Sequence, residues 1–259
     1  MISFGPSRAA SLSQSRSKQP RLAPFLQSSQ AASPLTLDDG SKSLRDFHSH
    51  LLPGVDDGVQ TYEDSLEILA RLSELGFSEV YLTPHFIHGT SQVSPVFENR
   101  KRFDLLRAKA IRAKIPITLH LGNEIYLDPD IEKLLRFGQV KPLGRTELLL
   151  VELPMSGEYP GYQDIFYQLL SNGHQVVLAH PERYLTFQKD YHLALELHAL
   201  GVLFQVNYGS FAGQYGRHAQ KTALKLLKDD LIFAYGTDLH RASSLDYLKP
   251  ALAKIEKHL

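Results

Sequence analysis

Histidine and carboxylate side chains recur along this chain at positions that suit a metal centre. The first pair is His48 and His50, and the last pair is Asp238 and His240. At predicted strand ends, or in the turns that follow them, the residues of the same chemistry between these pairs are Asp56, Asp57, His85, Glu124, Glu152 and His180. Imidazole and carboxylate ligands without thiolate suit Mn, Fe or Zn, and spacing alone does not choose among these metals. A metal-dependent hydrolase is therefore the first hypothesis.

The first two histidines end a predicted strand, where a period of two directs His48 and His50 to the same face. Both side chains can therefore reach one ion. The following turn, residues 51–58, brings Asp56 and Asp57 back over the strand end. One of these acids can be a ligand, and Asp57 is the predicted one. On its own, an Asp-Asp-Gly sequence is also typical of a simple polar turn.

The elements that must position these residues follow from apolar runs that alternate with amphipathic segments, a pattern typical of successive βα units. The predicted strands are 44–49, 79–83, 117–122, 147–153, 175–179, 202–206 and 231–235. The predicted helices are 61–75, 95–114, 128–137, 163–171, 191–200, 217–228 and 245–258. The first helix has a cap-like Thr61 with Asp64 three residues on, and Gly76 as its stop. The fold class predicted is α/β, a single distorted TIM-like (βα)7 barrel.

In a parallel barrel the carboxyl ends of all strands open on one mouth. Taken singly, a histidine at a strand end is more often structural, and Glu152 in an apolar strand can be half of a buried ion pair. Six of the seven predicted strands, however, end in such a residue. This coincidence favours a multinuclear metal site at the carboxyl ends of the strands.

The composition excludes several other classes of function. The chain has 259 residues, which suits one domain, predicted here for residues 44–259. Lys plus Arg and Asp plus Glu number 28 each, so no global field attracts nucleic acid. No apolar run approaches the roughly 20 residues that membrane insertion requires. Because cysteine is absent, a cysteinyl-phosphate mechanism is excluded and metal-activated water becomes the natural nucleophile.

The N-terminal residues 1–43 differ in composition from the rest. They are rich in Ser, Gln, Ala and Pro, and no acid precedes Asp38. This composition predicts a disordered tail whose role the sequence does not indicate. A cleaved organellar transit peptide is the alternative, because such peptides are also basic, rich in serine and poor in acids.

Taken together, the motifs resemble those of the PHP (polymerase and histidinol phosphatase) superfamily. The matching stretches are His48-x-His50, the turn 52–58, Thr83-Pro84-His85, Glu124, Glu152, the run 180–184 (His-Pro-Glu-Arg-Tyr) and Thr237-Asp238-x-His240. Within the superfamily, the chain is most similar to bacterial manganese-dependent protein-tyrosine phosphatases of the CpsB/YwqE type, which regulate capsular and exopolysaccharide synthesis. The resemblance covers residues 44–258 and leaves only the N-terminal tail unexplained.

The resemblance implies a trinuclear centre. The implied ligands of the first ion are His48, His50, Glu124 and Asp238. Glu124 would bridge to a second ion, whose other ligands are Glu152 and His180. The implied ligands of the third ion are Asp57, His85 and His240. Manganese is implied by the resemblance alone, and Fe or Zn would also suit these ligands.

The implied mechanism is hydrolysis without a covalent enzyme intermediate. A hydroxide that bridges the first two ions would attack phosphorus in line. Three divalent ions bring six positive charges, and the four carboxylate ligands cancel four of them. The remaining excess suits a phosphate dianion.

Three residues are predicted to act on the substrate. Arg183 can bind phosphate with its planar fork, although it can instead form a salt bridge with Glu182. Arg241, which follows His240, is a weaker second candidate, because the family's other phosphate arginine lies further on, in a stretch (242–245) that contains no arginine here. The proton for the leaving oxygen can come from a metal ligand such as Asp57 or from a second water.

The leading function is a protein-tyrosine phosphatase that acts on a phosphotyrosine protein, such as the tyrosine-rich tail of a polysaccharide-synthesis kinase, in the bacterial cytoplasm. The first alternative is a small-molecule phosphatase such as histidinol-phosphate phosphatase, although that group tends to have histidine at the position of Glu152. A non-catalytic metal-binding regulatory module is the second alternative. Residues 86–96 are the predicted lid, and His88 and Asn207 are predicted to lie at the rim of the barrel mouth.

Overall fold

The computed structural model describes residues 43–90 and 95–258 of the chain, so the predicted N-terminal tail lies outside the described residues except for Ser43. The strands confirm the α/β class with parallel pairing. They are β1 (Leu44–Ser49), β2 (Phe77–Leu82), β3 (His85–Phe86), β4 (Thr118–Leu121), β5 (Glu124–Tyr126), β6 (Leu148–Glu152), β7 (Gln175–Ala179), β8 (Leu203–Asn207) and β9 (Ile232–Gly236).

Helices follow most of the strands. The α-helices are α1 (Tyr62–Glu74), α2 (Val96–Arg112), α3 (Ile131–Arg136), α4 (Tyr162–Ser171), α5 (Leu185–Lys189), α6 (His192–Leu200), α7 (Tyr208–Phe211), α8 (Gly216–Lys228) and α9 (Leu248–Glu256). The 3-10 helices among the described residues are η2 (Pro181–Arg183) and η3 (Ala242–Tyr247). The predicted cap of α1 is confirmed, because the Asp64 backbone N–H donates to Thr61 Oγ1 over 3.1 Å.

Two predicted strands are each followed, after a short division, by a short strand that was not predicted. The strand predicted over 79–83 is β2, with β3 after it, and the strand predicted over 117–122 is β4, with β5 after it. Pro84 lies at the first division and has no N–H to donate to a ladder. Gly122 and Asn123 lie at the second division. Both interruptions come just before a predicted metal ligand, His85 on β3 and Glu124 on β5.

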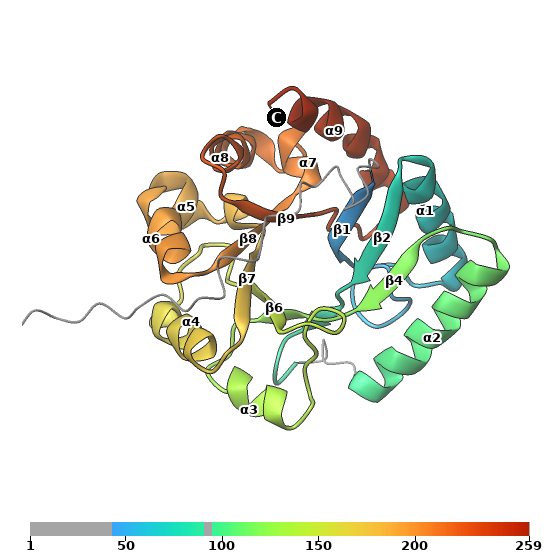
Figure 1. Ribbon diagram of the computed structural model, residues 1–259, viewed down its shortest axis with the longest axis horizontal. Coiled ribbons are helices and arrows are strands. Elements are labelled where there is room, and N and C mark those ends of the chain that lie inside the picture. Colours follow the sequence, from blue (N-terminus) through green and yellow to red (C-terminus); the bar gives the residue numbers. More distant parts are fainter. Residues whose placement is uncertain (1–42, 91–94, 259) are drawn as a thin grey trace, which may run out of the picture. The chain divides into compact units, whose positions relative to one another are not determined.

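The ladders of the described residues form two parallel sheets. The first has the order β1-β2-β4, and the second has the order β3-β5-β6-β7-β8-β9. In the described part of the chain no ladder joins β1 to β9, and a single bridge joins Ser49 of β1 to Leu239, which follows β9. Figure 1 shows the strands gathered around the centre of the molecule and the helices on the outside. Continuous hydrogen bonding around the whole ring, as in a closed barrel, is not seen.

Alternate side chains of the strands pack in two different cores. On β6, Leu149 and Val151 belong to the large core between the strands and the helices. Leu148 and Leu150 belong to a smaller inner core, which also contains Val177 of β7. Because side chains alternate along a strand, Glu152 continues the inner row of β6 and points to the same side as Leu150. The strand thus delivers a carboxylate to the carboxyl-end mouth above the inner core.

Candidate metal centre

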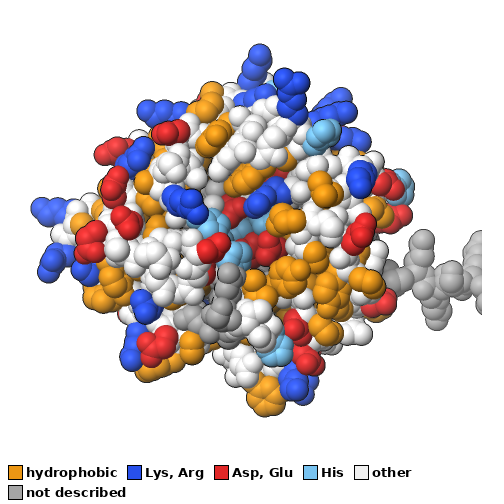
Figure 2. Space-filling model, turned by 180° about the vertical axis from the view of Figure 1, so that it is seen from behind, with side chains coloured by type: hydrophobic (Ala, Val, Ile, Leu, Met, Phe, Trp, Pro, Cys, Tyr) orange, Lys and Arg blue, Asp and Glu red, His pale blue; other side chains and the backbone are white. Residues whose placement is uncertain are grey.

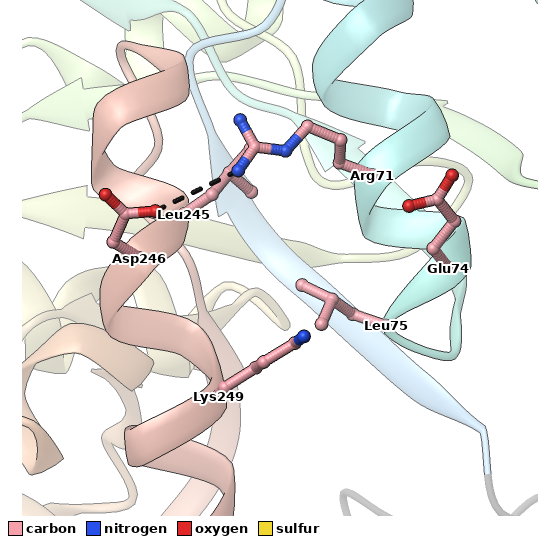
Figure 3. A pocket seen from close by; sticks show the side chains of 6 residues that line it. All are labelled: Arg71, Glu74, Leu75, Leu245, Asp246 and Lys249. Carbon is pink, nitrogen blue, oxygen red and sulfur yellow. Dashed lines mark ion pairs between the residues drawn. The ribbon is translucent and has the colours of Figure 1, made fainter.

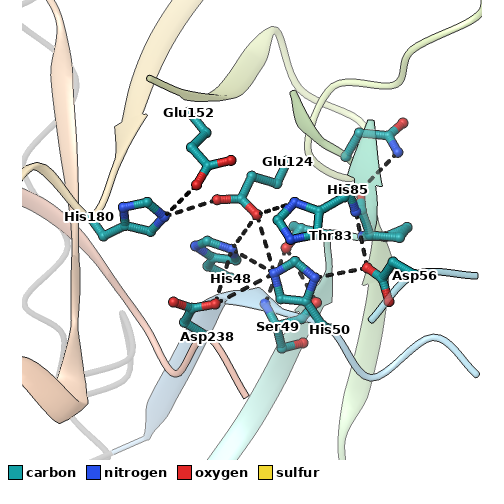
Figure 4. A network of polar contacts seen from close by, with 12 residues as sticks. His48, Ser49, His50, Asp56, Thr83, His85, Glu124, Glu152, His180 and Asp238 are labelled. Carbon is teal, nitrogen blue, oxygen red and sulfur yellow. Dashed lines mark hydrogen bonds and ion pairs between the residues drawn. The ribbon is translucent and has the colours of Figure 1, made fainter. Parts of the chain in front are cut away.

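All nine predicted metal ligands lie together at the carboxyl ends of the strands. Figure 4 shows seven of them converging, and Figure 2 shows histidine and acidic side chains in a hollow at the middle of one face. Four groups have donor atoms mutually within 4.8 Å. The groups are His50-Asp57-His85-His240, His48-Glu124-His180, His48-His50-Asp238 and His85-Glu124-Glu152. Each of the nine residues belongs to at least one group.

Glu124, the first residue of β5, is at the centre of the cluster. Its Oε1 lies 3.1 Å from His180 Nε2. Its Oε2 lies 3.2 Å from the Nε2 atoms of both His48 and His50, and 3.0 Å from His85 Nδ1. A single buried carboxylate therefore touches four imidazoles from three places in the fold, which are the end of β1, β3 and the end of β7.

The hydrogen bonding of the atoms around Glu124 is incomplete, and this arrangement suits the binding of a cation. Glu124 Oε2 and His85 Nδ1 are buried and make no hydrogen bond to a described residue, although they lie only 3.0 Å apart. The Nε2 atoms of His48 and His50 face each other at 3.1 Å. Buried polar atoms without a hydrogen bond are costly, and a bound ion would satisfy these atoms. The donor set thus fits the divalent metals that the sequence predicts.

The charges of the cluster also suit metal binding. Burial alone would lower the pKa of His48, but the carboxylates of Glu124 and Asp238 outweigh it and raise this pKa to about 9. Burial opposes ionisation of Glu124, yet the surrounding histidines hold its pKa well below the ordinary value. Burial and the adjacent Glu124 carboxylate raise the pKa of Glu152 to about 9. A divalent cation would favour the ionised form of all these carboxylates.

Two of the nine residues have backbone conformations that are unusual for their residue types. His180 follows β7 with φ 34° and ψ 54°, and Asp238 follows β9 with φ 52°. Both φ values lie in the left-handed region, which residues other than glycine rarely adopt. The turn at each strand end directs the side chain back towards Glu124 and His48, as the 3.1 Å contact of His180 and the 3.8 Å contact of Asp238 with them show.

Asp56 and Asp57 have different surroundings. Asp57 is 59% exposed, and its Oδ1 lies 3.5 Å from the Nε2 atoms of both His85 and His240. The Asp56 side chain is buried, and its Oδ2 accepts from His50 Nδ1 over 2.8 Å and from the His85 backbone N–H over 3.0 Å. A carboxylate on the far nitrogen of a metal-binding histidine orients the ring and makes it more basic. Sequence analysis named Asp56 only as an alternative ligand and missed this supporting role.

This geometry predicts the effect of replacing Asp56 by asparagine. We expect Asp56→Asn to weaken manganese binding by about tenfold, because the neutral amide supports His50 less well. The measurement is a metal titration of the chelated and dialysed protein. Asp128→Asn is the matched control, since Asp128 Oδ2 binds His88 Nδ1 over 3.0 Å at the surface. Equal metal affinities for Asp56→Asn and the wild type would contradict the supporting role.

A chain of amides on β8 joins two of the predicted ligands and was not predicted. Gln205 Oε1 lies 2.8 Å from His48 Nδ1, and Gln205 Nε2 donates to Asn207 Oδ1 over 2.9 Å. Asn207 Nδ2 then donates to Asp238 Oδ2 over 2.8 Å. Sequence analysis placed Asn207 at the rim of the mouth, whereas it is fully buried beneath it. The only signal for Gln205 was an amide in an otherwise apolar strand.

The residues predicted to act on the substrate differ in their surroundings. Arg183 Nη1 donates to Asp238 Oδ2 over 2.7 Å, and not to Glu182 as the alternative supposed. Arg241 is exposed and lines a cavity of about 420 Å³ together with Asp57 and His240. Residues 91–94 of the predicted lid lie outside the described residues.

A second cavity, of about 370 Å³, lies between α1 and the segment formed by η3 and α9 (Figure 3). Its lining contains two cationic and two anionic side chains. They are Arg71, Lys249, Glu74 and Asp246. Arg71 Nη2 and Asp246 Oδ1 lie 3.9 Å apart. Because its charges balance and it contains none of the nine clustered residues, this cavity does not extend the candidate metal centre.

Parallel strands covered by helices, with a histidine and carboxylate cluster at the strand ends, define the class of α/β proteins that hold metal ions at this edge. Within this class, the chain belongs to the CpsB/CapC family, described as "Capsular polysaccharide synthesis, CpsB/CapC", whose family model matches residues 44–259. No helix in the described residues is long and apolar enough to cross a membrane.

Curated relatives and solved structures agree with this family. The chain is 30% identical over 214 residues to tyrosine-protein phosphatase YwqE of Bacillus subtilis, which is 82% of this chain and 84% of that protein. It is 27% identical to the putative tyrosine-protein phosphatase CapC of Staphylococcus aureus, over 78% of this chain and 79% of that one.

Among solved structures, a chain reported with YwqE from B. subtilis and CpsB from Streptococcus pneumoniae, described as metal-dependent tyrosine phosphatases, gives a TM-score of 0.75. Its sequence identity is 29%, covering 83% of this chain and 87% of that chain. Histidinol phosphate phosphatase from Lactococcus lactis gives a TM-score of 0.52 at 16% identity, covering 83% and 92%. The second likeness extends to the fold alone.

Proposed function

We propose that this chain is a metal-dependent phosphomonoesterase that removes phosphate from phosphotyrosine in proteins. The observation that carries the proposal is the set of nine donor residues around the buried Glu124 carboxylate. Membership of the CpsB/CapC family supports it, because relatives in the comparison are tyrosine-protein phosphatases by name.

The proposed metal ligands are the nine residues predicted from the sequence, arranged for three divalent ions, with manganese as the preferred metal. The group of Asp57, His85 and His240 supports one ion, and His50 joins that group in the structure. His48, His50 and Asp238 support another ion together with Glu124, and Glu124 would be shared with the third, whose other ligands are Glu152 and His180. When bound, such ions would neutralise phosphate oxygens and lower the pKa of water to about 7, so that water is a nucleophile.

The side chains of the protein have distinct proposed tasks in the hydrolysis. Arg183 would bind phosphoryl oxygens with the guanidinium nitrogens that Asp238 does not engage. Asp57, exposed at the mouth, would pass a proton to the leaving phenolate oxygen directly or through a water that it holds. The P–O bond to tyrosine breaks as water attacks, and the products are tyrosine and inorganic phosphate. Arg241 is a second candidate for contact with the phosphoprotein.

We further propose that the two sheets are arcs of one distorted (βα)7 barrel. If β2 and β3 are counted as one interrupted strand, and β4 and β5 as another, seven strands remain. The bridge between Ser49 and Leu239 supports this interpretation, because it joins β1 to the residues that follow β9.

The proposed substrate is a phosphotyrosine protein of the polysaccharide-synthesis machinery, such as the tyrosine-rich tail of its kinase, reached in the cytoplasm. The family description supports the pathway, since it refers to capsular polysaccharide synthesis. The open mouth supports a protein substrate, because Asp57 is more than half exposed there.

The test is phosphate release by the manganese-loaded protein from a phosphotyrosine peptide and from histidinol phosphate, with a chelated sample of each. We expect kcat/KM to be at least about tenfold higher for the peptide, and release to stop on chelation. A preference for histidinol phosphate would assign the chain to small-molecule chemistry. Failure to hydrolyse either ester would favour a non-catalytic metal-binding module.

A further inference from the structure

An aromatic ring from outside the nine-residue cluster covers the guanidinium of Arg183. Tyr215 lies between α7 and α8, and Arg183 Cζ is 4.3 Å from the centroid of its ring. At this distance the negative face of the ring attracts the cation. The contact occupies one face of the guanidinium plane and leaves the edges, where the N–H groups lie, uncovered by the ring.

Arg183 has few other restraints. Nη1 donates to Asp238 Oδ2, and no other side-chain nitrogen of Arg183 has a hydrogen bond to the described residues. One hydrogen bond fixes one nitrogen but does not fix the plane of the guanidinium. The side chain is also 25% exposed, so water competes for its free donors. The Tyr215 ring is the contact that restrains the plane.

The segments that carry the two residues are joined by a buried carboxylate. Glu182 is fully buried, and its Oε1 accepts from Ser210 Oγ over 2.6 Å and from the Asn207 backbone N–H over 3.0 Å. Glu182 precedes Arg183 in η2, whereas Ser210 lies on α7, just before the segment with Tyr215. The turn that carries the arginine and the turn that carries the tyrosine are therefore held at a defined separation.

Close packing also restrains the segment with Tyr215. The Gln214 backbone N–H donates to Gly209 O over 3.0 Å. A Cβ atom built on Gly209 would lie 1.8 Å from Gln214 Oε1, so a larger residue cannot be accommodated there without movement. Tyr215 is thus presented to Arg183 from a tight connection between two helices.

We propose that Tyr215 is a positioning residue that orients the Arg183 guanidinium for phosphate binding, and that its ring, not its hydroxyl, does this. The inference rests on the proposed function, because it assumes that Arg183 binds the phosphate of the substrate. The hydroxyl is 3.4 Å from Asp238 Oδ2, near the upper limit for a hydrogen bond, and it also interacts with the Asn207 side chain, whereas only the ring covers the guanidinium.

The test compares Tyr215→Leu and Tyr215→Phe in the manganese-loaded full chain. For Tyr215→Leu we expect KM for a phosphotyrosine peptide and the inhibition constant of inorganic phosphate to rise together by about fivefold. We expect kcat to stay within about twofold, because Arg183 and its hydrogen bond to Asp238 remain and only the restraint on the guanidinium plane is lost. Tyr215→Phe keeps the ring and should match the wild type in all three constants.

Tyr191→Leu is the matched control. Lys225 Nζ lies 3.7 Å from the centroid of the Tyr191 ring, so this variant loses a similar cation–ring contact away from the cluster. It should leave KM and phosphate inhibition unchanged. Unchanged constants in Tyr215→Leu would overturn the proposal, and so would equal impairment of Tyr215→Phe and Tyr215→Leu, which would assign the effect to the hydroxyl.

A binding measurement separates failure of this inference from failure of the proposed function. If the wild type hydrolyses no ester, the phosphatase assignment fails. Calorimetric titration of the manganese-loaded protein with inorganic phosphate still compares the wild type with Tyr215→Leu. A fivefold weaker affinity in the variant would support the positioning role, whereas equal affinities or no phosphate binding in the wild type would overturn it.

Discussion

Replacing Glu124 with glutamine is expected to lower kcat/KM for a phosphotyrosine peptide by about a thousandfold. Glutamine has nearly the same shape, but it is neutral and its amide N–H₂ cannot ligate a cation. In the wild type both carboxylate oxygens face imidazole nitrogens at 3.0–3.2 Å, from His48, His50, His85 and His180. The substitution therefore affects four imidazole donors at once, and the metal content of the purified protein should fall with the activity.

Glu79→Gln is the matched control for this variant. Glu79 also binds a histidine, with Oε2 3.0 Å from His120 Nε2, and 24% of its side chain is exposed, whereas Glu124 is buried. It lies on β2, outside the nine-residue cluster. The control should keep its metal and its activity. Full metal content together with more than a tenth of wild-type kcat/KM in Glu124→Gln would contradict a central role for Glu124.

Loss of the Arg183 side chain is the second large effect. We expect Arg183→Ala to lower kcat/KM by about a hundredfold, through both KM and kcat, because a charge-assisted phosphate contact is lost as negative charge moves in the transition state. Arg183→Lys should recover only part of this loss, because an ammonium cannot reproduce the planar fork. Steady-state kinetics on the same peptide provides the measurement.

Two further variants test whether the loss of activity is specific to Arg183. Arg100→Ala removes an arginine whose Nε pairs with Asp104 Oδ2 over 2.9 Å on the exposed face of α2, and it should not change the kinetics. Arg241→Ala ranks the second candidate arginine, which is exposed beside Asp57 and His240. A larger loss in Arg241→Ala than in Arg183→Ala would reverse the assignment of the phosphate-binding arginine.

The members of the cluster could be predicted from the sequence because their positions follow one simple rule. Parallel strands bring their carboxyl ends to one edge, so residue type and position along each strand were enough to predict which side chains would meet. The rule worked even where strand boundaries shifted by a residue or two. The rule did not depend on the interruptions at Pro84 and Gly122, because His85 and Glu124 still lie just after these interruptions.

This rule could not predict the residues that support the cluster. Asp56 and Asp57 are adjacent acids in one turn, and only the backbone path of that turn decides which one is exposed and which is buried behind His50. Gln205 contacts His48 across 157 positions of sequence, and Tyr215 contacts Arg183 from a connection between helices. Such contacts depend on side-chain packing between strands and loops, which local patterns of polarity do not encode.

The left-handed backbone at His180 and Asp238 has a consequence for how this chain is shaped by selection. A non-glycine residue in that region costs of the order of 1 kcal/mol or more, whereas glycine adopts it freely. Glycine at either position would relieve the backbone but would remove a donor atom from the cluster. Selection for stability alone would therefore favour glycine at both positions. At His180 and Asp238 the chain instead keeps a side chain with a donor atom, at a cost in backbone conformational energy.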